Sequence, residues 1–208
     1  LQEELEKYKD YEPTDDNDRT KHQKYLEEIP QLVSNGFKAL EEIGLISPII
    51  CERQISLTSD NAPTFCPPCS LSVVGRPDFE LGVSVFGGKS PHETSPTATA
   101  AFPQKIIELK TKYSRLGKVK KDGSRSFVKA AIPTKPSFNH LVQCAFYTAY
   151  YNFKVPIHLL YVTEQDYKIF NSNNCPGLTV EGLKKNYQIM MNVFRRREKI
   201  LALNEDKS

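Results

Sequence analysis

The chain has 208 residues, 39% hydrophobic and 25% charged, a balance typical of a globular protein with one ordinary core. The formal charge of +3 is too small to argue for a nucleic-acid partner unless the charge is concentrated in one place. No apolar run approaches the ~20 residues that span a bilayer, and the charged N-terminus lacks a signal-peptide pattern, so we expect neither membrane insertion nor secretion.

The cysteines predict a reducing, cytoplasmic environment. There are five of them, an odd number, and they are scattered along the sequence. Cys66 and Cys69 form the one close pair, but no second pair accompanies them as a structural zinc site requires. We interpret this pair as an incidental part of a loop over residues 58–70.

The N-terminal part predicts helices. Residues 1–18 are acidic and polar and are expected to form a flexible segment. Asp18 or Thr20 is expected to cap a first helix, and Pro30 fits the first turn of a second helix that ends at Gly44. Apolar residues of this second helix recur at nearly helical spacing and are expected to face a core: Leu32, Val33, Phe37, Leu40 and Ile43.

Two strand-like stretches follow. In the first, over residues 49–57, Ile50, Glu52 and Gln54 are expected to share one face. The second, over residues 71–86, contains a glycine and a proline that predict an interruption near Asp78. A Ser/Thr/Pro-rich connector over residues 87–103 comes next and is expected to be a mobile insertion.

Residues 105–113 predict a short buried strand. Because side chains alternate along a strand, Glu108 and Lys110 share one face, and Ile107 and Leu109 share the other. A carboxylate and an ammonium group within an apolar strand are costly unless they are paired or bound to a ligand. A polar face that is solvated or salt-bridged remains the alternative interpretation.

Residues 114–135 are expected to form a second mobile insertion. Six bases lie in this stretch beside a single acid, Asp122. The run is either a solvated loop or a flap that adds sequence-independent affinity for a nucleic-acid backbone. The bases are Arg115, Lys118, Lys120, Lys121, Arg125 and Lys129.

The C-terminal part predicts a helix over residues 137–152, a buried strand after Pro156, a short strand over 167–170 and an amphipathic helix over 179–203. The whole order predicts an α/β fold in which helices flank a central mixed sheet. We expect a single domain over residues 19–203, followed by a charged tail over residues 204–208.

The order α-β-β-β-α-β resembles that of the PD-(D/E)XK nuclease superfamily. Its characteristic residues match Asp78 at the second strand and the acid-x-lysine pair Glu108 and Lys110 on the third. Gln143 and Tyr147 form a Gln-x-x-x-Tyr motif on the next helix. That motif is similar to one in the RecB-like branch, which includes phage exonucleases and the mitochondrial genome maintenance exonuclease.

The resemblance covers about residues 30–170 and implies a restriction-endonuclease-like αβββαβ core. It implies a Mg²⁺ ion, replaceable by Mn²⁺, bound by Asp78, Glu108 and the Leu109 carbonyl. The stretch E-R-Q-I-S-L resembles the acid-bearing first strand of the branch and contributes Glu52. Glu52 is either a further ligand or a surface acid beside Arg53.

The resemblance also implies roles for the remaining motif residues. Lys110 would orient the attacking water or offset charge on the phosphate. Gln143 would hydrogen-bond that water or the scissile phosphate. Tyr147, one helical turn further on, would contact nucleic acid.

These expectations describe a metal-dependent DNA exonuclease of bacterial or host cytoplasm, acting on single strands or free ends in phage-type or bacterial replication, recombination or repair. Two alternatives stay open: a structure-specific or restriction-like endonuclease, and a non-catalytic nucleic-acid-binding protein on the same fold. A single-strand-annealing or replication protein is an expected partner class. The oligomeric state is left open.

Overall fold

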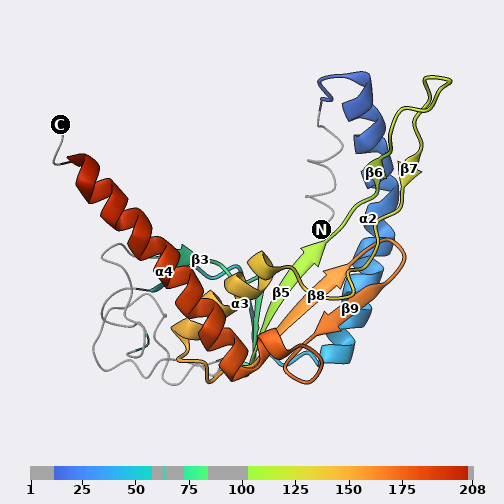
Figure 1. Cartoon of the computed structure of the whole chain (residues 1–208). Coiled ribbons are helices and arrows are strands. Elements are labelled where there is room, and N and C mark those ends of the chain that lie inside the picture. Colours follow the sequence, from blue (N-terminus) through green and yellow to red (C-terminus); the bar gives the residue numbers. More distant parts are fainter. Residues whose placement is uncertain (1–11, 58–62, 64–72, 84–102, 206–208) are drawn as a thin grey trace. The chain divides into compact units, whose positions relative to one another are not determined.

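The computed structural model describes residues 12–57, 63, 73–83 and 103–205. Cys66, Cys69 and nearly all of the 87–103 connector lie outside the described residues. The fold is mixed α/β around a central mixed sheet, as predicted (Figure 1). Within the described ranges, no helix is both long and apolar enough to cross a membrane.

The chain divides into two compact units. The first unit comprises Leu1–Ile43, Lys110–Thr134 and Tyr161–Lys168, and the second comprises Gly44–Leu109, Lys135–Leu160 and Ile169–Ser208.

Five strands form the central sheet. In spatial order they are β1 (Ile49–Cys51), β4 (Phe79–Leu81), β5 (Lys105–Thr111), β8 (Ile157–Val162) and β9 (Tyr167–Phe170). The pairs β1–β4 and β4–β5 are antiparallel. The long strand β5 confirms the strand predicted over residues 105–113, and its residues Ile106 to Glu108 are buried.

Strands β5 and β8 run in the same direction. The N–H of Ile106 donates to Pro156, and the N–H of Lys112 donates to Val162, so both strands advance together. A four-residue turn then connects β8 to β9 and reverses the chain. The sheet therefore combines antiparallel and parallel neighbours.

The strand predicted over residues 49–57 is wrong as a single element. It divides into β1 and β2 (Ile55–Leu57), because Glu52 adopts a positive φ of 50° and breaks the extended backbone. The N–H of Glu52 donates to the Asp78 carbonyl at 3.2 Å. The expected common face of Ile50, Glu52 and Gln54 therefore does not exist.

The interruption predicted near Asp78 is confirmed, and it also separates two sheets. Strand β3 (Val73–Gly75) pairs with β2 in a two-stranded sheet, whereas β4 belongs to the central sheet. Pro77 lies between them and has no N–H to offer a ladder. Asp78 is thus the residue at which the chain enters the central sheet.

Helix α2 (Asp16–Ile43) is one helix, so the prediction of two helices meeting at Pro30 is wrong. Pro30 is exposed, so its ring lies on the solvent side, while Leu32 packs in the core. The helix also begins earlier than expected, because the carboxylate of Asp15 accepts the Asp18 N–H at 2.7 Å.

One predicted core position of α2 is also wrong. Phe37 is 57% exposed. Asn35 is buried instead, and its amide donates to the carbonyls of Thr163 and Glu164 at 3.0 and 3.2 Å. A polar side chain with two backbone partners can occupy a buried position that spacing alone assigns to an apolar residue.

The C-terminal helices agree with the prediction. Helix α3 (Phe138–Tyr150) is capped by Ser137, and α4 (Val180–Glu205) follows the short 3₁₀ helix η1 (Pro176–Leu178). Helices α3 and α4 pack against each other within the second unit (Figure 1). Four apolar residues of α4 are buried, and Phe194 is half-buried; the buried ones are Leu183, Tyr187, Met190 and Met191.

Candidate functional site

Asp78 and Glu108 lie next to each other on neighbouring strands. Phe79 of β4 stands opposite Ile107 of β5, so the next pair along this antiparallel ladder is Asp78 and Glu108. The N–H of Leu109 donates to Asp78 Oδ2 at 2.6 Å. Glu108 is 1% exposed, whereas Asp78 is half-buried at the start of its strand.

This arrangement fits a hard cation such as Mg²⁺. Two carboxylates and the Leu109 carbonyl are oxygen donors, and Mg²⁺ uses one or two carboxylates and keeps several waters. Only Oδ2 of Asp78 takes the Leu109 amide bond, so Oδ1 can serve as a ligand. In the part of the chain that the structure describes, no three His, Cys, Asp or Glu side chains are grouped, and exposed Glu52 completes no such set.

Lys110 follows two residues after Glu108 in β5 and is half-buried. The alternation of side chains along this strand places both on the same face of it, as the sequence predicts. The boundary between the two units falls just before Lys110.

Gln143 and Tyr147 are joined on α3. The Nε2 of Gln143 donates to the Tyr147 hydroxyl at 2.7 Å, and that hydroxyl donates to the Arg76 carbonyl at 2.9 Å. Burial, the largest cause, and the nearby charges of Glu108 and Asp78 together raise the pKa of Tyr147 to about 12, although the hydrogen bond from Gln143 acts in the opposite direction. The hydroxyl therefore remains protonated and able to donate.

The burial of Tyr147 does not favour the expected contact with nucleic acid. Its side chain is 3% exposed, so it offers no surface to a nucleic-acid strand. Its hydroxyl instead fixes the amide of Gln143, with Nε2 turned toward Tyr147. Gln143 itself is half-buried and remains accessible.

Gly75 allows the segment that leads to Asp78 to approach α3. A Cβ at this position would lie 2.5 Å from Phe146 Cε1 and 3.0 Å from Tyr147 Cε1. Any larger residue would separate β3 from α3 or displace both aromatic rings. Packing thus explains the glycine three residues before Asp78: the backbone must pass close to the ring of Tyr147 before it reaches Asp78.

Sequence reasoning missed a buried cluster on the same segment. Glu80 is fully buried. Its Oε1 accepts a hydrogen bond from the end of the Arg53 guanidinium at 2.9 Å, and its Oε2 lies 2.8 Å from Arg53 Nε in an ion pair. The Tyr151 hydroxyl bonds to both Glu80 and Arg53. Burial lowers the pKa of Arg53, but the hydrogen bond to Glu80 and the neighbouring Tyr151 outweigh it and raise the pKa overall.

This cluster holds the strand that follows Asp78. Arg53 fixes the side chain of Glu80, and Glu52, its neighbour in sequence, fixes the carbonyl of Asp78. A sequence signal for it existed. Glu80 lies between two apolar residues, Phe79 and Leu81. Glu108 likewise lies between Ile107 and Leu109. In each case the apolar neighbours in sequence predict a buried carboxylate.

The six bases of the predicted flap lie in the first unit, whereas Asp78 and Glu108 lie in the second. All six are exposed, and they surround the two-stranded sheet of β6 (Arg115–Leu116) and β7 (Phe127–Val128). The expected mobile loop is therefore a β-hairpin. Its contact with nucleic acid stays a prediction.

Comparison with protein-family models, with curated proteins and with solved structures gave no significant match. Any assignment of function therefore depends on the geometry above and on the motif resemblance.

Proposed function

We propose that this protein is a metal-dependent nuclease, a class that hydrolyses phosphodiester bonds. More particularly, we propose a DNA exonuclease that acts on free ends in phage-type or bacterial replication, recombination or repair. The observation that carries the proposal is the adjacent placement of Asp78 and Glu108 across β4 and β5, with the Leu109 backbone between them.

The order of elements supports the proposal. When the two small sheets β2–β3 and β6–β7 are set aside, the remaining elements from α2 to β8 come in an order that resembles the αβββαβ order of PD-(D/E)XK nucleases. In the central sheet these strands lie side by side in the order β1, β4, β5 and β8. The pairs β1–β4 and β4–β5 are antiparallel, and the pair β5–β8 is parallel. Asp78 immediately precedes the second of these strands and Glu108 lies on the third, which supports the resemblance.

Each site residue has a role in this proposal. Asp78, Glu108 and the Leu109 carbonyl would bind Mg²⁺, which supplies an activated water and neutralises charge on the phosphate. The Lys110 ammonium would offset the charge that develops on the phosphate oxygens. Gln143, held by Tyr147, would orient the attacking water through its amide oxygen.

A cleavage time course tests this function. The substrates are end-labelled linear single-stranded DNA, linear duplex DNA and a single-stranded circle, each incubated with Mg²⁺, Mn²⁺ or EDTA. Glu108→Gln and Lys110→Ala remove the expected site. Glu181→Gln and Lys154→Ala make the same chemical changes at exposed positions outside it.

We expect loss of linear DNA only in the presence of metal, abolished by the two site variants and unchanged by their controls. Cleavage of the circle would indicate the endonuclease alternative. DNA binding in EDTA without cleavage under either metal would indicate a binding protein on this fold. Full activity of Lys110→Ala would contradict the assigned site.

A further inference from the structure

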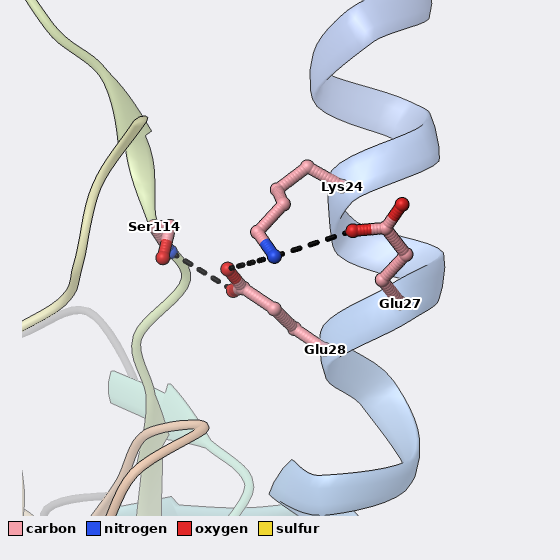
Figure 2. Close-up of polar contacts among 4 residues, drawn as sticks. All are labelled: Lys24, Glu27, Glu28 and Ser114. Atoms are coloured by element: carbon pink, nitrogen blue, oxygen red, sulfur yellow. Dashed lines mark hydrogen bonds and ion pairs between the residues drawn. The ribbon is translucent and has the colours of Figure 1, made fainter. Parts of the chain in front are cut away.

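The base of the β6–β7 hairpin is attached to its unit through three consecutive residues. The Lys112 N–H donates to the Val162 carbonyl at 2.9 Å. The Tyr113 ring lies 4.7 Å from the ring of Tyr25 on α2. The Ser114 N–H donates to the carboxylate of Glu28 at 3.0 Å (Figure 2).

Glu28 is the fully buried member of this attachment. Figure 2 shows Lys24 between two acids of α2: its ammonium lies 3.8 Å from Glu28 Oε1 and 3.2 Å from Glu27. Glu28 thus has a cation on one oxygen and the Ser114 amide on the other. A buried carboxylate with both partners holds Ser114, the residue just before β6, against α2.

Beyond this base the hairpin is regular. Gly117 N–H donates to Ser126 at 2.9 Å, and Lys120 N–H donates to Ser124 at 2.8 Å. At the turn, Asp122 accepts bonds from the Ser124 N–H and hydroxyl at 2.9 and 2.6 Å. These bonds lower the pKa of Asp122, so the carboxylate stays ionised and is held within the turn.

The result is a defined ribbon of positive charge. Six exposed bases and one acid give the stretch from Arg115 to Lys129 a formal charge of +5 (6 − 1). The exposed apolar residues among them are Val119 and Val128, and no aromatic side chain is exposed. Insertion into a membrane interface needs a continuous apolar face, and two exposed valines do not form one.

We propose that the hairpin from Arg115 to Lys129 is an arm that binds the sugar-phosphate backbone of a nucleic acid, and that Glu28 is its positioning residue. The partner follows from the proposed function, on which this inference rests. Exposed lysines and arginines bind the phosphates of a nucleic-acid backbone without regard to base sequence. The affinity of the hairpin for nucleic acid must therefore fall as the salt concentration rises.

The test measures binding in EDTA, so that cleavage plays no part. Fluorescence anisotropy with labelled single-stranded and duplex oligonucleotides gives affinity as a function of salt. The arm variant is K118A/K120A/K121A/R125A. The control R19A/K38A/K154A/K185A removes the same number of lysines and arginines at exposed positions outside the hairpin, so both carry a formal charge of −1 (3 − 4).

We expect the arm variant to lose more than about tenfold in affinity, with a salt slope shallower by about 3, since each phosphate contact contributes about 0.7 to 0.9. The control should keep the wild-type slope. Equal losses in both variants would overturn the proposal, because net charge alone would then explain them. Tighter binding to phosphatidylserine vesicles than to DNA, lost in the arm variant, would also overturn it.

Glu28 has its own test. Glu28→Ala should raise hydrogen exchange at the Ser114 amide and weaken binding several-fold while leaving the salt slope unchanged, because every base is still present. Glu28→Gln keeps an acceptor for Ser114 and should restore most of the affinity. An unchanged affinity in Glu28→Ala, despite faster exchange at Ser114, would show that the anchor does not position the arm.

The two proposals fail separately. Wild-type protein that binds DNA through the hairpin but never cleaves would contradict the nuclease function and leave the arm intact. Wild-type protein that cleaves, with an arm variant that binds and cleaves equally well, would contradict the arm alone.

Discussion

Two buried glutamates, one in each unit, solve the same physical problem differently. Glu80 faces a guanidinium that donates a hydrogen bond to one carboxylate oxygen at 2.9 Å and forms an ion pair with the other at 2.8 Å. Glu28 has a more distant ammonium, at 3.8 Å, and a backbone amide at 3.0 Å. Both carboxylates are fully buried. Removal of the Glu80 carboxylate therefore leaves the Arg53 guanidinium without its counter-ion, whereas removal of the Glu28 carboxylate leaves mainly the Ser114 N–H without an acceptor.

The largest effect should therefore follow from breaking the pair at Glu80. Glu80→Gln leaves the Arg53 guanidinium, 14% exposed, without its counter-ion, and we expect a loss of about 3–5 kcal/mol in the free energy of unfolding. Chemical denaturation measures it. The double variant Arg53→Met/Glu80→Leu should recover much of the loss, and a double variant no better than the single one would contradict the comparison.

Glu28→Ala should cost less, about 1–3 kcal/mol, because the Ser114 amide loses its acceptor while Lys24 keeps Glu27 as a neighbour. The same denaturation experiment gives the value. If this loss equalled or exceeded that of Glu80→Gln, a guanidinium without its counter-ion would be no more costly than an N–H without its acceptor, and the comparison would be wrong.

A substitution on α3 should have a smaller effect on stability than on activity. Tyr147→Phe removes the hydroxyl that links Gln143 to the Arg76 carbonyl but keeps the buried ring, so we expect a loss of about 1 kcal/mol. Under the proposed nuclease function, DNA cleavage should fall more than the loss of stability explains, because the hydrogen bond that orients Gln143 is gone. Phe146→Leu, a neighbouring core change, should reduce stability without a comparable loss of cleavage.

The smallest expected effect is the contribution of His158, a residue of the second unit, to the change of folding stability with pH. Burial, together with the charge of Lys105, lowers the pKa of His158 below its usual value near 6.5. The unfolded chain then binds more protons below about pH 6.5, so stability must decrease as the pH falls from there toward the folded-state pKa. His158→Gln should remove this slope in denaturation measurements made between pH 7 and 5, and an unchanged slope would contradict the assignment.

How much of this could be predicted depends on whether the cause is local. The strand that carries Glu108 is confirmed because alternation along one strand is a local property. Pro30 misled the prediction because propensity marks it as a helix start, whereas packing on both sides continues the helix. The break at Glu52 gave no warning, since a glutamate rarely adopts positive φ.

The candidate site shows the same division. Asp78 and Glu108 were predicted to converge, and the register of β4 and β5 brings them together. The burial of Tyr147 and the pairing of Arg53 with Glu80 depend on contacts between residues far apart in the sequence, 71 and 27 positions respectively. No window of local sequence contains both members of such a pair.

The parallel pairing of β5 with β8 has a consequence for folding. It joins residues 50 positions apart, as from Ile106 to Pro156, and closing a loop of that size costs entropy before any contact repays it. The β6–β7 and β8–β9 hairpins and the single helices need only local contacts, so they can form first. Until β8 docks, one edge of β5 is open to pairing with another chain. The strand that bears Glu108 is therefore open to aggregation during synthesis until β8 has docked.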